Sequence, residues 1–315
     1  MSADDSVLAR MITTIDDNTN GFRLDLMRMA LSSSDASAQS LLQATLALSS
    51  FHLGRAEEAL KHKVRAIKSL SESVRTESAS KPTQLAACLM LCVYSVFDAT
   101  DTTWNVHLQG AKTISGALTK QEQEMSCFEF ISPWYNYHDT LSGYSLPAHL
   151  PGKKHRAPRI ILPESDSENR KEIHIVVGES TGTLDHQRIT LTAEFYRVAT
   201  LLYLYQIAPD IAIPEQAVQN LVRNGFKLMD QMNPCTSPWP LFIIACNVTS
   251  DSERLKILTV LNAMIQKRRI GNYRIIKGLI QTLWKQQDLT ADEVIPKKID
   301  WRNLIDPDSC TPSFI

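Results

Sequence analysis

Apolar side chains recur every three or four residues along most of this chain, and segments with strand-like alternation are scarce. This spacing matches the turn of an α-helix, which presents one apolar stripe to its neighbours. Between residues 85 and 96 the stripe contains Leu85, Cys88, Leu89, Cys92, Val93 and Val96. Between residues 56 and 74 it contains Ala56, Leu60, Val64, Ile67 and Val74. The pattern predicts an all-α, single-domain bundle of roughly ten helices.

A proline-rich stretch interrupts the helical pattern between residues 143 and 190. It also contains several glycines and serines and a charged run, and little of it resembles a strand. Such a composition is typical of a connecting excursion between packed units. We therefore expect a lead at 1–22, a helical domain at 23–287 that includes the excursion 143–190, and a polar C-terminal tail at 288–315.

The charge balance and the N-terminus argue against several classes of partner. The formal net charge is -1, so no overall electrostatic attraction to nucleic acid is expected. The first residues lack a signal-peptide pattern, and no apolar run approaches the roughly 18 residues that span a bilayer. We expect an intracellular, soluble protein without a membrane partner.

Cysteine usage gives no indication of a metal site. The six cysteines are spread along the chain and none belongs to a Cys-x-x-Cys pair. Cys88 and Cys92 are one helical turn apart, but their apolar flanks favour packing as core thiols. The sequence therefore predicts no metal and no cofactor.

The stretch Trp104-Asn-Val-His-Leu-Gln-Gly-Ala is the most distinctive in the chain. On a helix, Trp104, His107, Gly110 and Ala111 fall within roughly one third of the circumference. One interpretation places Trp104 and His107 in a ligand cavity, with the imidazole as a hydrogen-bonding group. The other places them in a close helix crossing, as core residues.

Further aromatic and polar residues are candidates for a ligand-binding surface. Trp134, Tyr137, His138 and Asp139 lie close together in the sequence, and the apolar segments farther on contain Tyr203, Phe242 and Cys246. All of them could equally be core residues. If the protein is an enzyme, the acid–base candidates are His107, His138 and Asp139, although adjacent residues on a helix point about 100° apart.

Several segments together resemble the regulatory domain of fungal binuclear zinc-cluster transcription factors, over roughly residues 23 to 287. An Ala- and Leu-rich helix before His52-Leu53, the helix at 85–96 and Trp104-x-x-His107-x-x-Gly110-Ala111 occur in the order that this family uses. The second half resembles the family's C-terminal signature in the segment 238–246, Asp251, Arg254, Gly271-Asn272 and Trp284.

Two departures accompany the resemblance. Ala245 precedes Cys246 where the family usually has Gly, and the six-cysteine zinc cluster is missing from this sequence, because its cysteine spacings are wrong. The resemblance implies a small-molecule-responsive, dimerising regulatory domain in the nucleus. It also implies that DNA is contacted only through a zinc cluster not present here.

Two other functions remain open from the residues alone. The chain could be a cytoplasmic, cofactor-independent cyclase or isomerase of fungal secondary metabolism, built on the same scaffold. It could also be a protein-interaction module without a ligand. No recognisable enzyme motif is present, which favours a regulator that binds an apolar effector.

Overall fold

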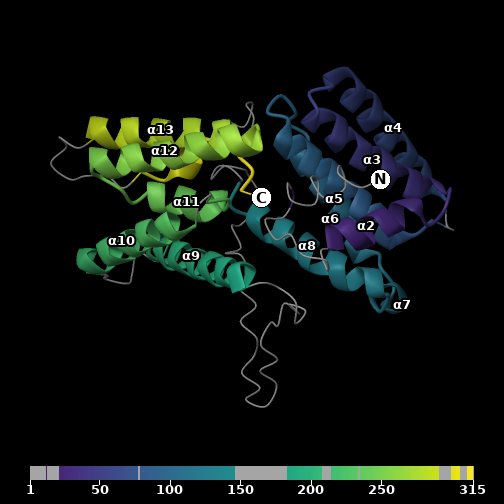
Figure 1. Cartoon of the computed structure of the whole chain (residues 1–315), viewed down its shortest axis with the longest axis horizontal. Coiled ribbons are helices and arrows are strands. Elements are labelled where there is room, and N and C mark those ends of the chain that lie inside the picture. The colour runs from purple at the N-terminus through teal and green to yellow at the C-terminus, as the bar shows by residue number, and fades with distance from the viewer. Residues whose placement is uncertain are drawn as a thin grey trace, which may run out of the picture.

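The chain folds into an all-α protein, as the periodicity predicts. The computed structural model describes Ile12 and residues 21–76, 79–145, 183–207, 214–232, 235–290, 299–305 and 311–314. Within these ranges every regular element is helical, and the elements form two halves that lie side by side (Figure 1). The excursion predicted at 143–190 lies largely outside the described residues. Its last part, from Thr183, already belongs to a helix.

The N-terminal half contains α2 (Gly21–Leu31), α3 (Ala36–His52), α4 (Ala56–Arg75), α5 (Lys81–Phe97), α6 (Trp104–Gly116), α7 (Lys120–Gln123) and α8 (Ser126–Ser142). Helix α5 is its centre, because every residue from Pro82 to Phe97 is buried. Ser80 caps the start of α5 through its side chain, and Pro82 occupies the first turn, where its missing N–H has no helical partner. The Leu-, Ala- and Cys-rich sequence of α5 lets helices α3, α4, α6 and α8 surround it.

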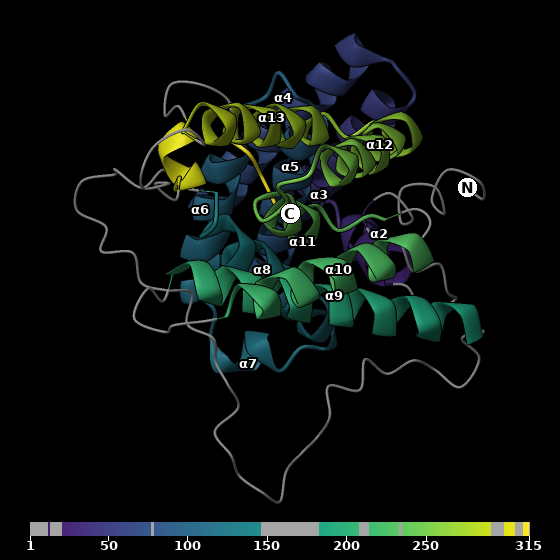
Figure 2. The ribbon, with the colours of Figure 1, turned by 90° about the vertical axis from the view of Figure 1, so that its left-hand side faces the viewer.

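The C-terminal half contains α9 (Thr183–Ile207), α10 (Glu215–Gln231), α11 (Pro238–Ala245), α12 (Asp251–Arg268), α13 (Asn272–Thr290) and the short 3-10 helix η1 (Trp301–Leu304). Helices α12 and α13 form one layer, α9 and α10 another, and α11 lies between them (Figures 1 and 2). All eight residues of α11 are buried, as its uniformly apolar sequence requires. Ser250 caps α12 by accepting a hydrogen bond from the backbone N–H of Glu253, which confirms the capping motif seen in the sequence.

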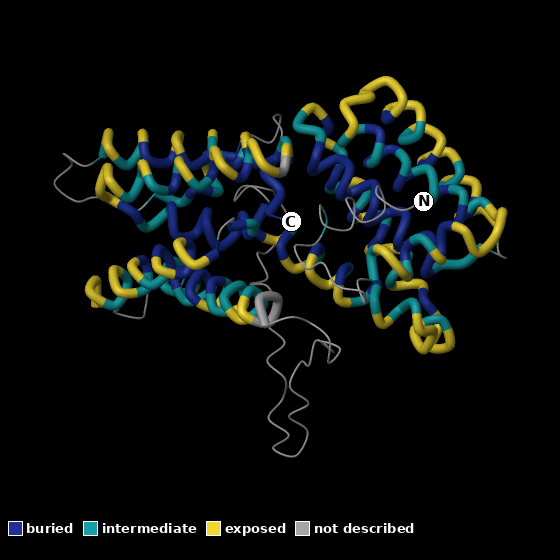
Figure 3. The backbone as a smooth tube through the Cα atoms, viewed as in Figure 1, coloured by how far each residue is buried: buried dark blue, intermediate teal, exposed yellow. Residues whose placement is uncertain are grey.

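Helix α4 does not bury the apolar stripe that its sequence predicts. Its buried residues are small, namely Ala59, Ala66 and Ser73, and they lie against α3. The Ser40 hydroxyl of α3 donates to the Ala66 carbonyl oxygen at 2.9 Å, which requires a close approach of the two helices. Large side chains would hold α3 and α4 apart, so they occupy the outer face of α4 instead (Figure 3).

The end of the chain is packed, although a polar tail was expected there. Trp301 and Phe314 are buried, and their rings lie 4.9 Å and 4.8 Å from that of Phe242 in α11. Isolated apolar residues in a polar stretch leave no periodic pattern, so the sequence did not indicate this packing. None of the described helices combines the length and the hydropathy needed to cross a lipid bilayer.

Replacing Phe314 by Ala is expected to lower the free energy of unfolding by about 3–5 kcal/mol, because it empties a fully buried aromatic site. Urea denaturation followed by circular dichroism measures the change. Leu289→Ala is the matched control, since Leu289 is exposed and its truncation should change stability by less than about 0.5 kcal/mol. Equal effects of the two substitutions would contradict the packing of the C-terminal segment.

Candidate functional site

A cleft of about 610 Å³ lies where the two halves of the protein meet. One wall comes from the C-terminal ends of α3 and α5, and the other from the end of α12 and the start of α13. Its apolar lining includes Phe51, Phe97, Ile265 and Ile270. Its polar lining includes His52, Asp98, Gln266, Arg269 and Arg274. An apolar wall with a few polar groups is the usual composition of a small-molecule site.

The cleft is held together at one side by a backbone contact of Gly271. The Gly271 N–H donates to the carbonyl oxygen of Phe97 at 2.9 Å, which joins the start of α13 to the end of α5. A Cβ atom at position 271 would lie 2.7 Å from that oxygen and would overlap the backbone of Ala99. Only glycine permits this approach, so residue 271 fixes the distance between the two walls.

Two arginines give the cleft a positively charged rim. Among the described residues, neither Arg269 nor Arg274 forms an ion pair with a carboxylate. The Asp98 carboxylate accepts hydrogen bonds from the backbone N–H and the hydroxyl of Thr100, at 3.0 Å and 2.7 Å. Burial, followed by the charge of Arg269, lowers the pKa of His52, which favours the neutral imidazole.

Arg269 also has an unusual backbone conformation. It ends α12 in the left-handed region, with φ 52° and ψ 30°. A residue with a Cβ rarely adopts this conformation, which favours glycine or asparagine at the end of a helix. This conformation makes the turn that leads from α12 to Gly271 and places Arg269 at the cleft.

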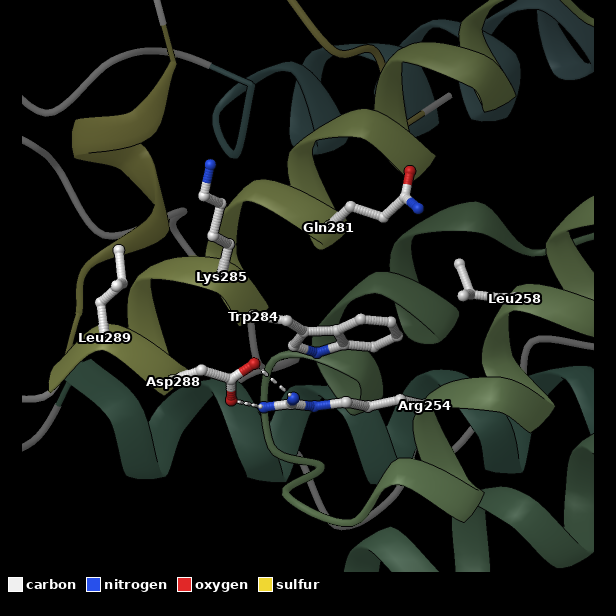
Figure 4. Close-up of a pocket in the computed structure, with 7 residues that line it drawn as sticks. All are labelled: Arg254, Leu258, Gln281, Trp284, Lys285, Asp288 and Leu289. Carbon is white, nitrogen blue, oxygen red and sulfur yellow. Dashed lines mark hydrogen bonds and ion pairs between the residues drawn. The ribbon is translucent and has the colours of Figure 1, made fainter. Parts of the chain in front are cut away.

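A second, shallower groove of about 420 Å³ lies between α12 and α13 (Figure 4). Arg254 binds Asp288 there through two hydrogen bonds of 2.9 Å and 2.8 Å. The Arg254 guanidinium also lies over the Trp284 ring, 5.5 Å from its centre. The Trp284 indole N–H donates to the Ala245 carbonyl oxygen at 2.8 Å. These charged and polar groups hold α11, α12 and α13 together, which favours a structural role for the groove.

Asn272 makes a comparable link next to the cleft. Its side-chain oxygen accepts a hydrogen bond from the Ser313 N–H at 2.9 Å, and its amide group donates to the Ser313 carbonyl oxygen. The Trp104 indole N–H in the other half donates to the Thr311 carbonyl oxygen at 3.3 Å. Residues 311–314 therefore contact both halves of the protein.

Comparison with known proteins places these features in a family. The model of the fungal specific transcription factor domain matches residues 5–182 and 156–315 of this chain. The chain belongs to the fungal specific transcription factor domain family. The transcription factor iacI of Pestalotiopsis fici is 24% identical over 98% of this chain and 93% of its own length. No solved structure matches this chain.

Membership of this family makes the chain a regulatory domain of a fungal transcription factor and gives the sequence signature a physical meaning. Arg254, Trp284 and Ala245 form one connected set of contacts, while Gly271 and Asn272 join α13 to α5 and to the C-terminal segment. The second half of the signature thus consists of residues that hold helices together.

Trp104 and His107, the most distinctive candidates, lie in the N-terminal half and do not line the cleft. Trp104 is buried, with its indole directed to Thr311. The His107 Nε2 atom is 3.2 Å from the Thr103 hydroxyl, and burial lowers the pKa of His107 to about 4. Gly110, on the same face, leaves room for the Cys88 sulfur, to which an added Cβ would lie at 3.5 Å.

The candidates on α8 take part in separate contacts. Trp134 packs edge-on against Phe22, with ring centres 4.9 Å apart. Tyr137 lies with its hydroxyl 3.0 Å from that of Tyr196. The His138 Nδ1 atom is 3.7 Å from the Cys92 sulfur, whereas Asp139 forms an ion pair with Lys112 at 3.1 Å.

His138 and Asp139 therefore have different partners and do not act on one another as an acid–base pair. Burial lowers the pKa of His138 to about 3, which keeps its imidazole neutral. Together with His107, these residues line neither of the two cavities, so the geometry offers no support for a catalytic centre made of them.

The remaining candidates surround α11 in the C-terminal half. Tyr203 packs against Tyr144 at 4.9 Å and lies 6.3 Å from Trp239. Phe242 is fully buried, and Cys246 is half-buried, with its carbonyl oxygen accepting from Gln287 at 3.4 Å. None of the three lines the cleft. The seven ligand-binding candidates are therefore spread over the cores of both halves.

Sequence reasoning missed the cleft because its residues come from the ends of four helices. None of Asp98, Arg269 or Arg274 belongs to a local motif with a chemical meaning. The one local signal was Gly271, which was identified only as a helix boundary.

Gly271→Ala is expected to lower the free energy of unfolding by about 1–3 kcal/mol, because the added methyl group pushes the two halves apart. Gly278→Ala is the matched control on the same helix. No atom lies within 4 Å of a Cβ at position 278, so this substitution should stabilise α13 by up to about 1 kcal/mol. Chemical denaturation of both variants measures the difference; similar stability would contradict the close approach at Gly271.

Stability should also fall as the pH drops from about 7 toward 5, because His107 and His138 are buried as neutral groups. Their folded-state pKa values lie below the unfolded value of about 6.5, so the unfolded chain binds more protons in this window. The stabilisation is complete above the unfolded pKa and is lost as the pH falls. Urea unfolding of the wild type and of His138→Leu at several pH values tests this. An unchanged pH slope in the variant would refute the assignment for His138.

Proposed function

We propose that this regulatory domain responds to a small molecule that binds in the cleft between its two halves. The position of the cleft carries the proposal. A ligand in contact with α3 and α5 on one side and with α12 and α13 on the other favours one relative placement of the halves. An effector acts by binding one arrangement better than another, and a difference of a few kcal/mol is sufficient.

The contacts between the halves are few and local, which supports such a response. The Gly271–Phe97 hydrogen bond lies at the cleft, while Trp104 reaches the C-terminal segment through Thr311. Tyr144, just after α8, packs on Trp239 of α11 with ring centres 4.9 Å apart. A modest change in the free energy of one contact can then change how the halves pack.

The cleft favours an apolar molecule that carries one acidic group. The rings of Phe51 and Phe97 and the side chains of Ile265 and Ile270 fit an apolar body. Arg269 and Arg274 fit a carboxylate or another anion, because a guanidinium binds such groups through paired hydrogen bonds. The effector expected from the sequence was apolar; the arginines add an anionic group to that description.

The family also carries the remaining parts of the proposal. A regulatory domain of a transcription factor acts in the nucleus, and its protein partner is a second copy of the chain. The six cysteines of this sequence lack the spacing of a zinc cluster, so contact with DNA would be made by such a cluster and not by these helices.

Titration calorimetry with decanoate, decanol and decyltrimethylammonium tests the class of ligand. We expect decanoate to bind best and Arg269→Gln/Arg274→Gln to weaken its binding by about tenfold or more, since charge-assisted hydrogen bonds contribute roughly 1.5–3 kcal/mol. Arg65→Gln/Arg223→Gln removes two other exposed arginines and serves as the matched control. Equal binding of all three probes, or equal losses in both double variants, would overturn the proposal.

Hydrogen exchange of the Gly271 amide reports on the response itself. This N–H is bonded to Phe97 across the boundary of the halves, so binding that favours the closed arrangement should slow its exchange. An exchange rate unaffected by saturating decanoate would show binding without a change in packing.

A further inference from the structure

Helix α4 distributes its side chains in the opposite way from an ordinary surface helix. Its buried face is formed by Ala59, Ala66 and Ser73. Its large aliphatic side chains are exposed, namely Leu60 at 57%, Val64 at 59%, Ile67 at 40% and Val74 at 61%. An amphipathic surface helix normally directs such residues to the core.

The four exposed residues form one continuous surface, here called the α4 stripe. Their spacings of three, four and seven residues place them on one side of the helix over about 21 Å of its length. The outer side of α4 lies at the edge of the N-terminal half, and none of the described residues covers the stripe (Figures 1 and 3). Single exposed aliphatic residues are ordinary, whereas a contiguous stripe marks an interaction surface.

We infer that the α4 stripe binds the same stripe of a second copy of this chain, with the two α4 helices antiparallel about a twofold axis. The contact is independent of the cleft and of any ligand bound there. It specifies the surface through which a regulatory domain of this kind would pair.

The charges at the ends of α4 support this occupant and this direction. Glu57 and Arg75 are 18 positions apart, which is five complete helical turns, so both lie on the same edge of the stripe. In an antiparallel pair, the same edges of the two helices face one another. Glu57 of each copy therefore meets Arg75 of the second copy, once at each end of the contact.

The centre of the stripe fits the same symmetry axis. Position 66 is midway between Glu57 and Arg75, and Val64 and Ile67 lie on either side of it. In a twofold contact centred there, Val64 of one copy packs on Ile67 of the other, and the reverse contact forms as well. A parallel pair would instead bring the Glu57 edge against the opposite edge, which carries Lys63. Lys63 is already bound to Asp101.

The apolar contact supplies the free energy, and the end charges set the direction. Glu57 is exposed and already forms an ion pair with Lys61 at 2.6 Å, so its contact with Arg75 of the second copy adds little energy. Its main effect is on orientation, since reversal of one helix would remove both end contacts.

Sedimentation velocity of the whole chain over a range of concentrations tests the interface. We expect the wild type to dimerise and Ile67→Glu to raise the dimer dissociation constant at least about tenfold, because the charge lies at the centre of the contact. Leu255→Glu is the matched control, since Leu255 is an exposed residue on α12 in the other half. Circular dichroism and decanoate titration of Ile67→Glu establish that the fold and the cleft are retained.

A charge reversal tests the antiparallel direction. Arg75→Glu should weaken the dimer, whereas the double variant Glu57→Arg/Arg75→Glu should restore its affinity, because both end contacts form again with exchanged charges. A wild type that stays monomeric up to about 100 μM, or equal effects of Ile67→Glu and Leu255→Glu, would overturn the interface. Failure of the double variant to regain affinity would overturn the antiparallel arrangement.

Discussion

The close approach of Gly271 to the end of α5 determines how the two halves of this protein meet. Because residue 271 lacks a side chain, its N–H reaches the Phe97 carbonyl oxygen at 2.9 Å and the start of α13 rests on Ala99. The cleft beside this contact inherits its dimensions from that distance. The left-handed turn at Arg269 brings the chain to this point, so a single loop sets both the spacing and the charge of the cleft.

The family signature is best understood as a set of connections between helices. Arg254 lies between Asp288 and the ring of Trp284, and the indole of Trp284 reaches Ala245 at the end of α11. These groups are mutually satisfied, so they lock three helices without requiring a ligand. The unpaired charge is found instead at Arg269 and Arg274, which form no ion pair among the described residues and lie outside the recognisable motifs.

Local sequence patterns predicted the helical class and several helix ends well. Ser250 caps α12, and Gly54, with φ 77°, follows the end of α3, as their residue types indicate. Periodicity could not tell which of two faces of α4 is buried, because small residues also pack closely when the neighbouring helix offers a serine such as Ser40. The cleft was beyond prediction, since it depends on the tertiary contact of four helix ends. The packed aromatic residues after α13 were missed because they are isolated in the sequence.

The contact between Trp104 and Thr311 joins residues 207 positions apart. Most of the other contacts in each half are between neighbouring helices, which form quickly because only short loops must close. The two halves can therefore fold independently, whereas their fixation against each other requires the closure of a very long loop, whose entropic cost is larger. The cleft is completed only at this late step, so a ligand that binds there would act on the slowest and least cooperative stage of folding as well as on the finished domain.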